Sequence, residues 1–156
     1  MTPSAVGRVI AGFPLLCAVS ACTNEQSWTT LNDTIDVLIK QQRYSEASKV
    51  AKRALALAEK TFGPHHLHVC TNLNTLASLA TLHGNYEEAA PLYQRCLGIQ
   101  EKAFGPAAPQ LIDTLSALAH LSARQGNVTT LGPLYQRLLA IREKTLRADH
   151  PDVVDT

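Results

Sequence analysis

Three histidines stand close together in the stretch His65-His66-Leu67-His68, and the neutral imidazole ring is a common metal ligand. Such a tract binds zinc or nickel only where neighbouring groups hold the rings in position. The corresponding stretch further along the chain, Asp149-His150-Pro151-Asp152, has His150 where His66 stands and contains no other histidine. We therefore interpret the tract as a connector between helices, and we predict no metal and no cofactor.

The sequence contains no motif that indicates catalysis. It has no Cys-x-x-Cys pair, no glycine-rich phosphate loop and no Gly-x-Ser-x-Gly elbow. Asp113, Ser116 and His120 are predicted to share one face of one helix, which is common and does not make a catalytic triad. Asn32 and Asn127 begin glycosylation sequons, which matter only in a eukaryotic secretory route. We predict that the protein is not an enzyme.

The first residues have the layout of a secretory signal. One cation, Arg8, precedes an uncharged apolar run from Val9 to Val19, and small residues then lead into Cys22. The run is well short of the roughly 20 residues that span a bilayer, which argues against a permanent transmembrane helix. We predict a cleaved signal peptide at residues 1–21. The alternatives are an apolar capping segment or a wrongly assigned start of a cytoplasmic protein.

The sequence Val19-Ser20-Ala21-Cys22 resembles the bacterial lipobox, whose cysteine is acylated and becomes the mature N-terminus. That resemblance implies lipidation at Cys22, followed by a short linker over residues 22–27. Several acyl chains would anchor the protein stably, whereas a single chain binds a membrane only reversibly. Because Thr23 rather than Asp follows the cysteine, the resemblance points to the outer membrane of a Gram-negative cell envelope.

The charge balance argues against a nucleic-acid partner. The full chain has 156 residues with 14 Lys+Arg and 13 Asp+Glu, and Arg8 is the one charged residue before Cys22. The predicted mature chain is therefore neutral, which favours neither nucleic acid nor an anionic membrane surface. Aromatic residues make up 5% of the chain, too few for a base-stacking platform.

The sequence repeats itself every 42 residues. The stretch GNYEEAAPLYQRCLGIQEKAFGP at Gly84–Pro106 returns as GNVTTLGPLYQRLLAIREKTLRA at Gly126–Ala148, and a weaker copy lies upstream. Glu59, Glu101 and Glu143 keep the same spacing. A fixed period of this size predicts a stacked repeat array, in which each unit cannot bury its apolar face alone.

Each unit predicts two helices. In the middle unit, apolar residues recur from Val69 to Ala80 at steps of three and four, as in an amphipathic helix. Gly84-Asn85 can end that helix in a left-handed conformation, and Glu87 and Glu88 suit the start of the next. We expect helix pairs within residues 28–60 (28–41 with 45–60), 69–102 (69–83 with 87–102) and 111–145 (111–125 with 129–145), and the start of a further helix at 150–156.

Cys70 and Cys96 fall where Ile112 and Leu138 stand one period later. We interpret them as small apolar side chains packed between helices, in preference to a disulfide or a metal pair. In an exported protein they could still pair if the fold brought them close together.

From about Trp28 to its end, the chain resembles tetratricopeptide (TPR) repeats of the 42-residue kinesin-light-chain-like subtype. The residues that carry the resemblance are Leu73-Asn74-Thr75-Leu76-Ala77, Gly84-Asn85-Tyr86, Pro91-Leu92-Tyr93-Gln94-Arg95 and the matching Pro133-Leu134-Tyr135-Gln136-Arg137. Two departures are Gln42-Arg43 in place of Gly-Asn, and Leu131 in place of a small alanine. The resemblance implies an all-α right-handed solenoid of about three helix pairs.

By resemblance, such an array binds a peptide or helix of a partner protein in a concave groove lined by the first helix of each pair. Asn32 and Asn74 match an asparagine that hydrogen-bonds an extended ligand backbone, whereas Lys40 and Arg124 are too few cations for a carboxylate clamp. The alternative is that these positions are only solvated. The implied groove residues are Thr29, Asn32, Asp36 and Lys40, then Thr71, Asn74, Ser78 and Leu82, then Asp113, Ser116, His120 and Arg124.

The sequence therefore predicts a non-enzymatic protein-binding module in the cell envelope, tethered through Cys22. Three alternatives stay open. One is a self-associating repeat protein that forms a homo-oligomer through the last helix pair, which has no predicted cap. Another is an enzyme accessory or scavenging metal binder that uses the tract from His65 to His68. The third is a cytoplasmic fragment of a longer array.

Overall fold

The protein consists of helices joined by short turns in the computed structural model, which describes residues 14–149 and their side chains from 24 to 145. No strand occurs within residues 14–149. A 3-10 turn, Pro109–Leu111, leads into the fifth helix. The helices are α1 (Pro14–Lys40), α2 (Tyr44–Phe62), α3 (Leu67–Leu82), α4 (Tyr86–Phe104), α5 (Ile112–Arg124) and α6 (Val128–Asp149).

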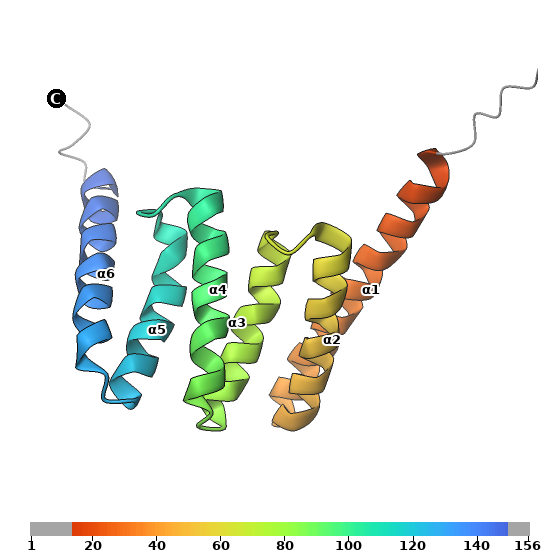
Figure 1. Ribbon diagram of the computed structural model, residues 1–156. Coiled ribbons are helices and arrows are strands. Elements are labelled where there is room, and N and C mark those ends of the chain that lie inside the picture. Colours follow the sequence, from red (N-terminus) through yellow and green to blue (C-terminus); the bar gives the residue numbers. More distant parts are fainter. Residues whose placement is uncertain (1–13, 150–156) are drawn as a thin grey trace, which may run out of the picture.

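Successive helices run in alternating directions and stand side by side in chain order (Figure 1). Each helix packs mainly against its neighbours in the chain, α1 on α2, α2 on α3, and so on to α5 on α6. The odd-numbered helices are the first helices of the three predicted pairs, and the even-numbered helices are the second. This one-dimensional packing is that of a helix-pair solenoid, so the predicted all-α fold is confirmed.

Helix α1 begins earlier than expected. The sequence predicts a linker at 22–27, but α1 runs from Pro14, so those residues are helical. The stretch contains no glycine or proline to stop the helix from extending upstream. Trp28 is the first buried side chain in the described part of the chain. Residues 1–13 and the helix start expected at 150–156 lie outside the described residues.

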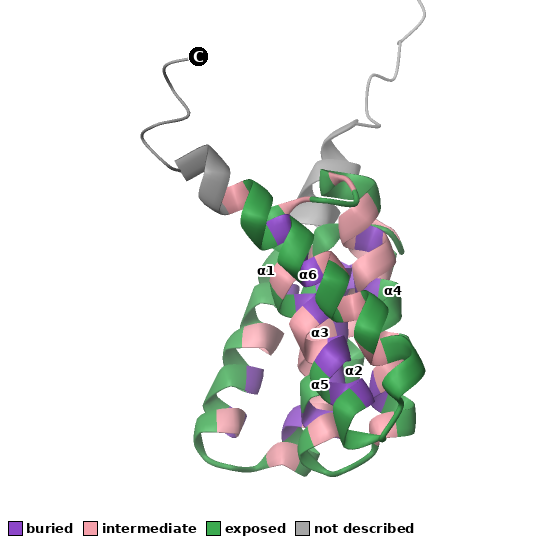
Figure 2. Ribbon diagram, turned by 90° about the vertical axis from the view of Figure 1, so that its left-hand side faces the viewer, coloured by how far each residue is buried: buried purple, intermediate pink, exposed green. Residues whose placement is uncertain are grey.

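The core lies between neighbouring helices, where Figure 2 shows the buried residues gathered on the facing sides. The apolar stripe predicted on α3 is confirmed, because Val69, Leu73 and Ala77 are fully buried. The second helices contribute small residues, such as Ala47 and Ala89, which allow close helix approach. Leu131, which replaces that alanine in the third pair, is only half-buried.

A chain of hydrogen bonds between polar side chains joins α1 to α3. The indole N–H of Trp28 donates to Oδ1 of the fully buried Asn72 (2.7 Å), whose Nδ2 donates to Oδ1 of Asn32 (2.8 Å). The amide of Asn32 in turn donates to the carbonyl oxygen of Trp28 (2.8 Å). Because these buried polar groups satisfy one another, they hold the two first helices in one register.

The turns inside the helix pairs share a left-handed residue. Gly84 and Gly126 have φ of 77° and 68°, and Gln42 has φ of 60° at the equivalent position in the first pair. A side chain at positive φ brings Cβ close to the backbone, at a cost of roughly 1–2 kcal/mol. Gln42 therefore strains the turn between α1 and α2, whereas glycine adopts the same conformation without strain in the other two turns.

We expect Gln42→Gly to stabilise the protein by about 1 kcal/mol, because glycine adopts this conformation without the Cβ clash. The melting temperature should rise by about 2–4 °C in a calorimetric scan. The matched control, Gly84→Gln, should lower it by a similar amount. No atom lies within 4 Å of a Cβ built at Gly84, so that loss would come from the backbone alone. Equal stability of Gln42→Gly and the natural chain would contradict the argument.

Candidate functional site

The predicted groove residues lie on α1, α3 and α5. Asn32, Asn74 and Ser116 are half-buried. The structure gathers only some of these positions into hollows. The exposed members are Thr29, Asp36, Lys40, Thr71, Ser78, Leu82, Asp113, His120 and Arg124.

One hollow, of about 290 Å³, lies between α1 and α3. Asn74 lines it, and Oδ1 of Asn74 is buried without a hydrogen-bond partner among the described residues. Ser78, also at the hollow, shares a hydrogen bond of 2.9 Å with the hydroxyl of Tyr93 on α4. Ile39, Leu79 and Leu82 supply apolar walls, and Leu82 is 66% exposed. The hollow thus has apolar walls beside a residue whose buried oxygen is unpaired among the described residues.

The two asparagines expected to act alike do not have the same environment. The amide of Asn32 is engaged at both atoms, by Asn72 and by the carbonyl of Trp28. The side chain of Asn74 has no such neighbour for its oxygen among the residues that the structure describes. Asn32 therefore serves helix packing, whereas the buried oxygen of Asn74 has no hydrogen-bond partner among the described residues.

A second hollow, of about 480 Å³, lies at the last helix pair. Ser116 and His120 of α5 line one side, and Tyr135, Leu139 and Arg142 of α6 line the other. Sequence reasoning assigned Ser116 and His120 to the groove but missed the α6 residues, because it considered first helices alone. No hydrogen bond or ion pair in the described structure links His120 to Asp113 or Ser116.

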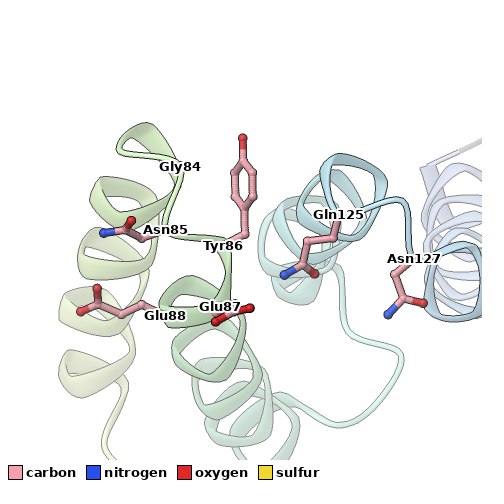
Figure 3. Close-up of a pocket in the computed structure, with 7 residues that line it drawn as sticks. All are labelled: Gly84, Asn85, Tyr86, Glu87, Glu88, Gln125 and Asn127. Atoms are coloured by element: carbon pink, nitrogen blue, oxygen red, sulfur yellow. The ribbon is translucent and has the colours of Figure 1, made fainter.

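The turns form a further open pocket of about 900 Å³, between the α3–α4 turn and the α5–α6 turn (Figure 3). Glu87 from α4 faces the space between the two turns, while Gln125 and Asn127 line its other side. Glu88 is already paired with Lys52 on α2, at 3.5 Å. No group of three or more His, Cys, Asp or Glu side chains within the described residues could hold a metal ion.

An apolar cavity of about 560 Å³ opens between α4, α5 and α6. Leu97, Leu118, Leu121 and Leu134 line it. Its polar edge includes Thr130, whose hydroxyl donates to the hydroxyl of Ser122 at 3.0 Å. Sequence reasoning missed this cavity, because three helices from two repeat units enclose it and no local motif marks it.

Cys70 and Cys96 are joined by a disulfide between α3 and α4, with their Cα atoms 4.6 Å apart. The preferred interpretation as separate packed side chains was therefore wrong. Cys70 lies near the start of α3 and Cys96 in the second half of α4, so the antiparallel pairing of the two helices brings them together. Both residues are buried, at 3% and 0% exposure. The antiparallel register of the pair was the signal that could have identified the bond.

The histidine tract belongs to the packing at the start of α3. The ring nitrogen Nδ1 of His66 accepts from the backbone N–H of His68 (3.2 Å), which caps the helix. The ring of His68 lies 4.3 Å from that of Trp28 and 4.7 Å from that of Phe62. Burial lowers the pKa of His68, neighbouring His66 lowers it further, and Glu25 opposes the shift. These contacts place His66 and His68 in the packing between α1, α2 and α3.

None of the helices in the described part of the chain is long and apolar enough to cross a membrane.

Family models for the tetratricopeptide repeat match residues 29–102 and residues 114–148. The crystal structure of the TPR domain of Arabidopsis FLU is similar, with a TM-score of 0.68 and 20% identity over 78% of this chain and 98% of that one. A putative kinesin light chain of Podosopora anserina with nearly identical TPR-like repeats has a TM-score of 0.66 and 23% identity. A second crystal structure of that protein, carrying one substitution, has a TM-score of 0.67. The match covers 80% of this chain and 59% of the Podosopora chain.

These structural likenesses establish the fold and agree with the resemblance inferred from the repeat. No curated protein matches the sequence closely enough to indicate a relative.

The lowered pKa of His68 makes the stability of the array depend on pH. Below the ordinary histidine pKa of about 6.5, the unfolded chain takes up a proton at His68 before the folded chain does. The contribution of His68 to stability should therefore be complete above about pH 6.5 and be lost as the pH drops from there towards the lowered pKa of the folded state. We expect a lower melting temperature at about pH 5 than at about pH 7.5.

The variant His68→Gln should reduce that difference, because no proton then distinguishes the two states at this position. His120→Gln changes an exposed histidine away from the rings of Trp28 and Phe62, and it is the matched control. It should retain the difference in melting temperature between the two pH values. An unchanged pH dependence in His68→Gln would contradict the assignment.

Proposed function

Because the chain belongs to the tetratricopeptide-repeat family, we propose that it is a non-enzymatic module that binds a peptide or helix of a partner protein on its first helices. The TPR fold is generally a protein–protein interaction module, and catalysis has no support from the residues described above.

The unused acceptor of Asn74 is the observation that carries the proposal. A buried oxygen without a donor costs free energy, of the order of 1–3 kcal/mol, which a ligand N–H can recover. The hollow beside it offers apolar walls from Ile39, Leu79 and Leu82. The oxygen of Asn74 is buried, so the side chain would have to turn toward the hollow to accept from an extended backbone while one apolar side chain enters.

The charges on the same face argue against a strongly charged ligand. Asp36 and Lys40 both stand exposed on α1, and Asp113 and Arg124 both stand exposed on α5. Since these charges are of mixed sign, they set no strong preference for a positively or a negatively charged ligand. We therefore expect recognition through the peptide backbone and apolar side chains.

We also propose that the protein is exported and tethered through Cys22. The apolar run and the lipobox-like residues support export, and the buried Cys70–Cys96 disulfide suits an oxidising compartment. Cleavage before Cys22 would leave Trp28, with its partners on α3, in the mature chain.

Self-association is a second candidate function. The observation that favours it is the exposure of Tyr135 and Leu139 on the last helix, at 55% and 58%. Large apolar side chains exposed together mark an interaction surface more often than isolated ones.

The partner-binding proposal predicts that peptides selected from a random library against the full chain depend on Asn74. Asn74→Ala should weaken their binding about tenfold, because the backbone N–H loses its acceptor. Gln94→Ala, on α4 away from the hollow, is the control and should bind normally. Fluorescence anisotropy with labelled peptides measures both. Binding that Asn74→Ala leaves intact would place the ligand elsewhere, and failure to select any peptide would count against the proposal.

The export proposal predicts a specific mass. Expressed in a Gram-negative host, the chain should lose residues 1–21, gain acyl chains and partition into detergent. Cys22→Ser should abolish the acylation. Intact-mass spectrometry of both proteins makes the measurement, and an unprocessed soluble protein would contradict the proposal.

A further inference from the structure

A ladder of ion pairs connects the second helices of the solenoid. Arg95 on α4 contacts Glu59 on α2 at 2.6 Å, and Arg137 on α6 contacts Glu101 on α4 at the same distance. Each arginine also donates to a connector carbonyl, Arg95 to that of Pro64 and Arg137 to that of Pro106. In each case the glutamate of one unit binds the arginine of the following unit.

The two ends of this ladder carry opposite charges that have no partner among the described residues. Arg53 stands one period before Arg95, and Glu143 stands one period after Glu101. Both side chains are exposed, and neither forms an ion pair or a hydrogen bond within the described part of the chain. Arg53 therefore lacks a preceding glutamate, and Glu143 lacks a following arginine, among the described residues.

We propose that the protein assembles head to tail, with the first helix pair of one copy continuing the solenoid of another copy beyond its last helix pair. In this arrangement, Arg53 of the incoming copy binds Glu143 and adds one more rung to the ladder. The proposal concerns the ends of the array and does not depend on peptide binding at Asn74. It gives the self-association considered above a definite geometry.

The receiving surface is formed by α6 together with α5. Tyr93 on α4 is 6% exposed because the third pair covers it, whereas Tyr135, one period later, is 55% exposed. Leu97 packs against the core of the third pair, whereas its equivalent Leu139 is 58% exposed. The last pair thus presents the apolar surface that each preceding unit buries against its successor. Covering it would remove apolar area from water.

The incoming surface is the outer face of α1, which carries Thr30, Thr34 and Val37. Both threonine hydroxyls donate to carbonyls of their own helix, Thr30 to Gln26 and Thr34 to Thr30, each at 2.8 Å. Both threonine hydroxyls can keep these hydrogen bonds when the face is buried. Their methyl groups can then pack against the other copy. Val37, 50% exposed, holds the repeat position of Leu79 and Leu121. In the second and third units those leucines face the preceding unit.

These two surfaces differ from each other, so the contact is heterologous. A heterologous contact that does not close into a ring produces an open chain of copies. The threonine face is less apolar than the leucine-rich faces inside the array, so the contact between copies should be weaker than that between repeats. Concentration should therefore control the length of the assembly.

Charge reversal tests the geometry. Sedimentation velocity over a range of concentrations should be run on the full chain carrying Cys22→Ser in every sample, so that no acyl chain contributes. The parent should grow beyond a dimer as its concentration rises. Glu143→Arg and Arg53→Glu should each weaken association about fivefold, as expected for losing a surface ion pair and gaining a repulsion. The double variant should recover most of the loss.

Two matched controls carry the same charge changes elsewhere on the surface. Glu87→Arg and Lys102→Glu, both at exposed positions of α4, should associate like the parent. A parent that stays monomeric, or whose growth stops at a dimer, would overturn the head-to-tail proposal. So would a double variant that fails to recover. Association that appears only after residues 150–156 are deleted would assign the receiving surface to the chain's own terminus and also overturn it.

Discussion

Each helix pair in this protein exposes an apolar face that only the next pair can cover. Leu111 and Leu115 at the start of the third pair are fully buried, and Leu97 of the second pair packs against their cluster. Because burial comes from neighbouring units, stability follows from the interfaces between them and not from one central core. Small residues on the second helices, such as Ala51 and Ala54, make that close stacking possible.

Two further interactions reinforce the middle of the array. The Cys70–Cys96 disulfide joins the helices of the second pair, and the Trp28–Asn72–Asn32 chain of hydrogen bonds joins the first pair to the second. A cross-link between positions this far apart restricts the unfolded chain and stabilises the fold by about 3 kcal/mol. The hydrogen bonds fix the register of α1 against α3 more than they raise the free energy of unfolding, since their polar groups would otherwise bond to water.

The same stacking explains how a regular scaffold acquires distinct surfaces. Asn32 and Asn74 occupy equivalent positions, yet Asn32 is committed to Asn72 while the oxygen of Asn74 is unused among the described residues. Tyr93 and Tyr135 are also equivalent, yet the first is buried and the second exposed. The repeat therefore leaves some groups without the neighbour that the equivalent group has in another unit.

The sequence alone determined the helices, their order and their stacking. Its 42-residue period and its spacing of apolar residues predicted five helices to within a few residues of their observed ends, because amphipathic periodicity and turn residues are local properties. The start of α1 was missed, since no glycine or proline between Pro14 and Trp28 marks a helix boundary. Only the tertiary structure showed that Cys70 is bonded to Cys96 and that Asn72 donates a hydrogen bond to Asn32. It also showed that Arg53 and Glu143 stand at the two ends of a ladder of ion pairs. Those facts depend on which side chains from different helices come within contact distance, and periodicity does not encode that distance.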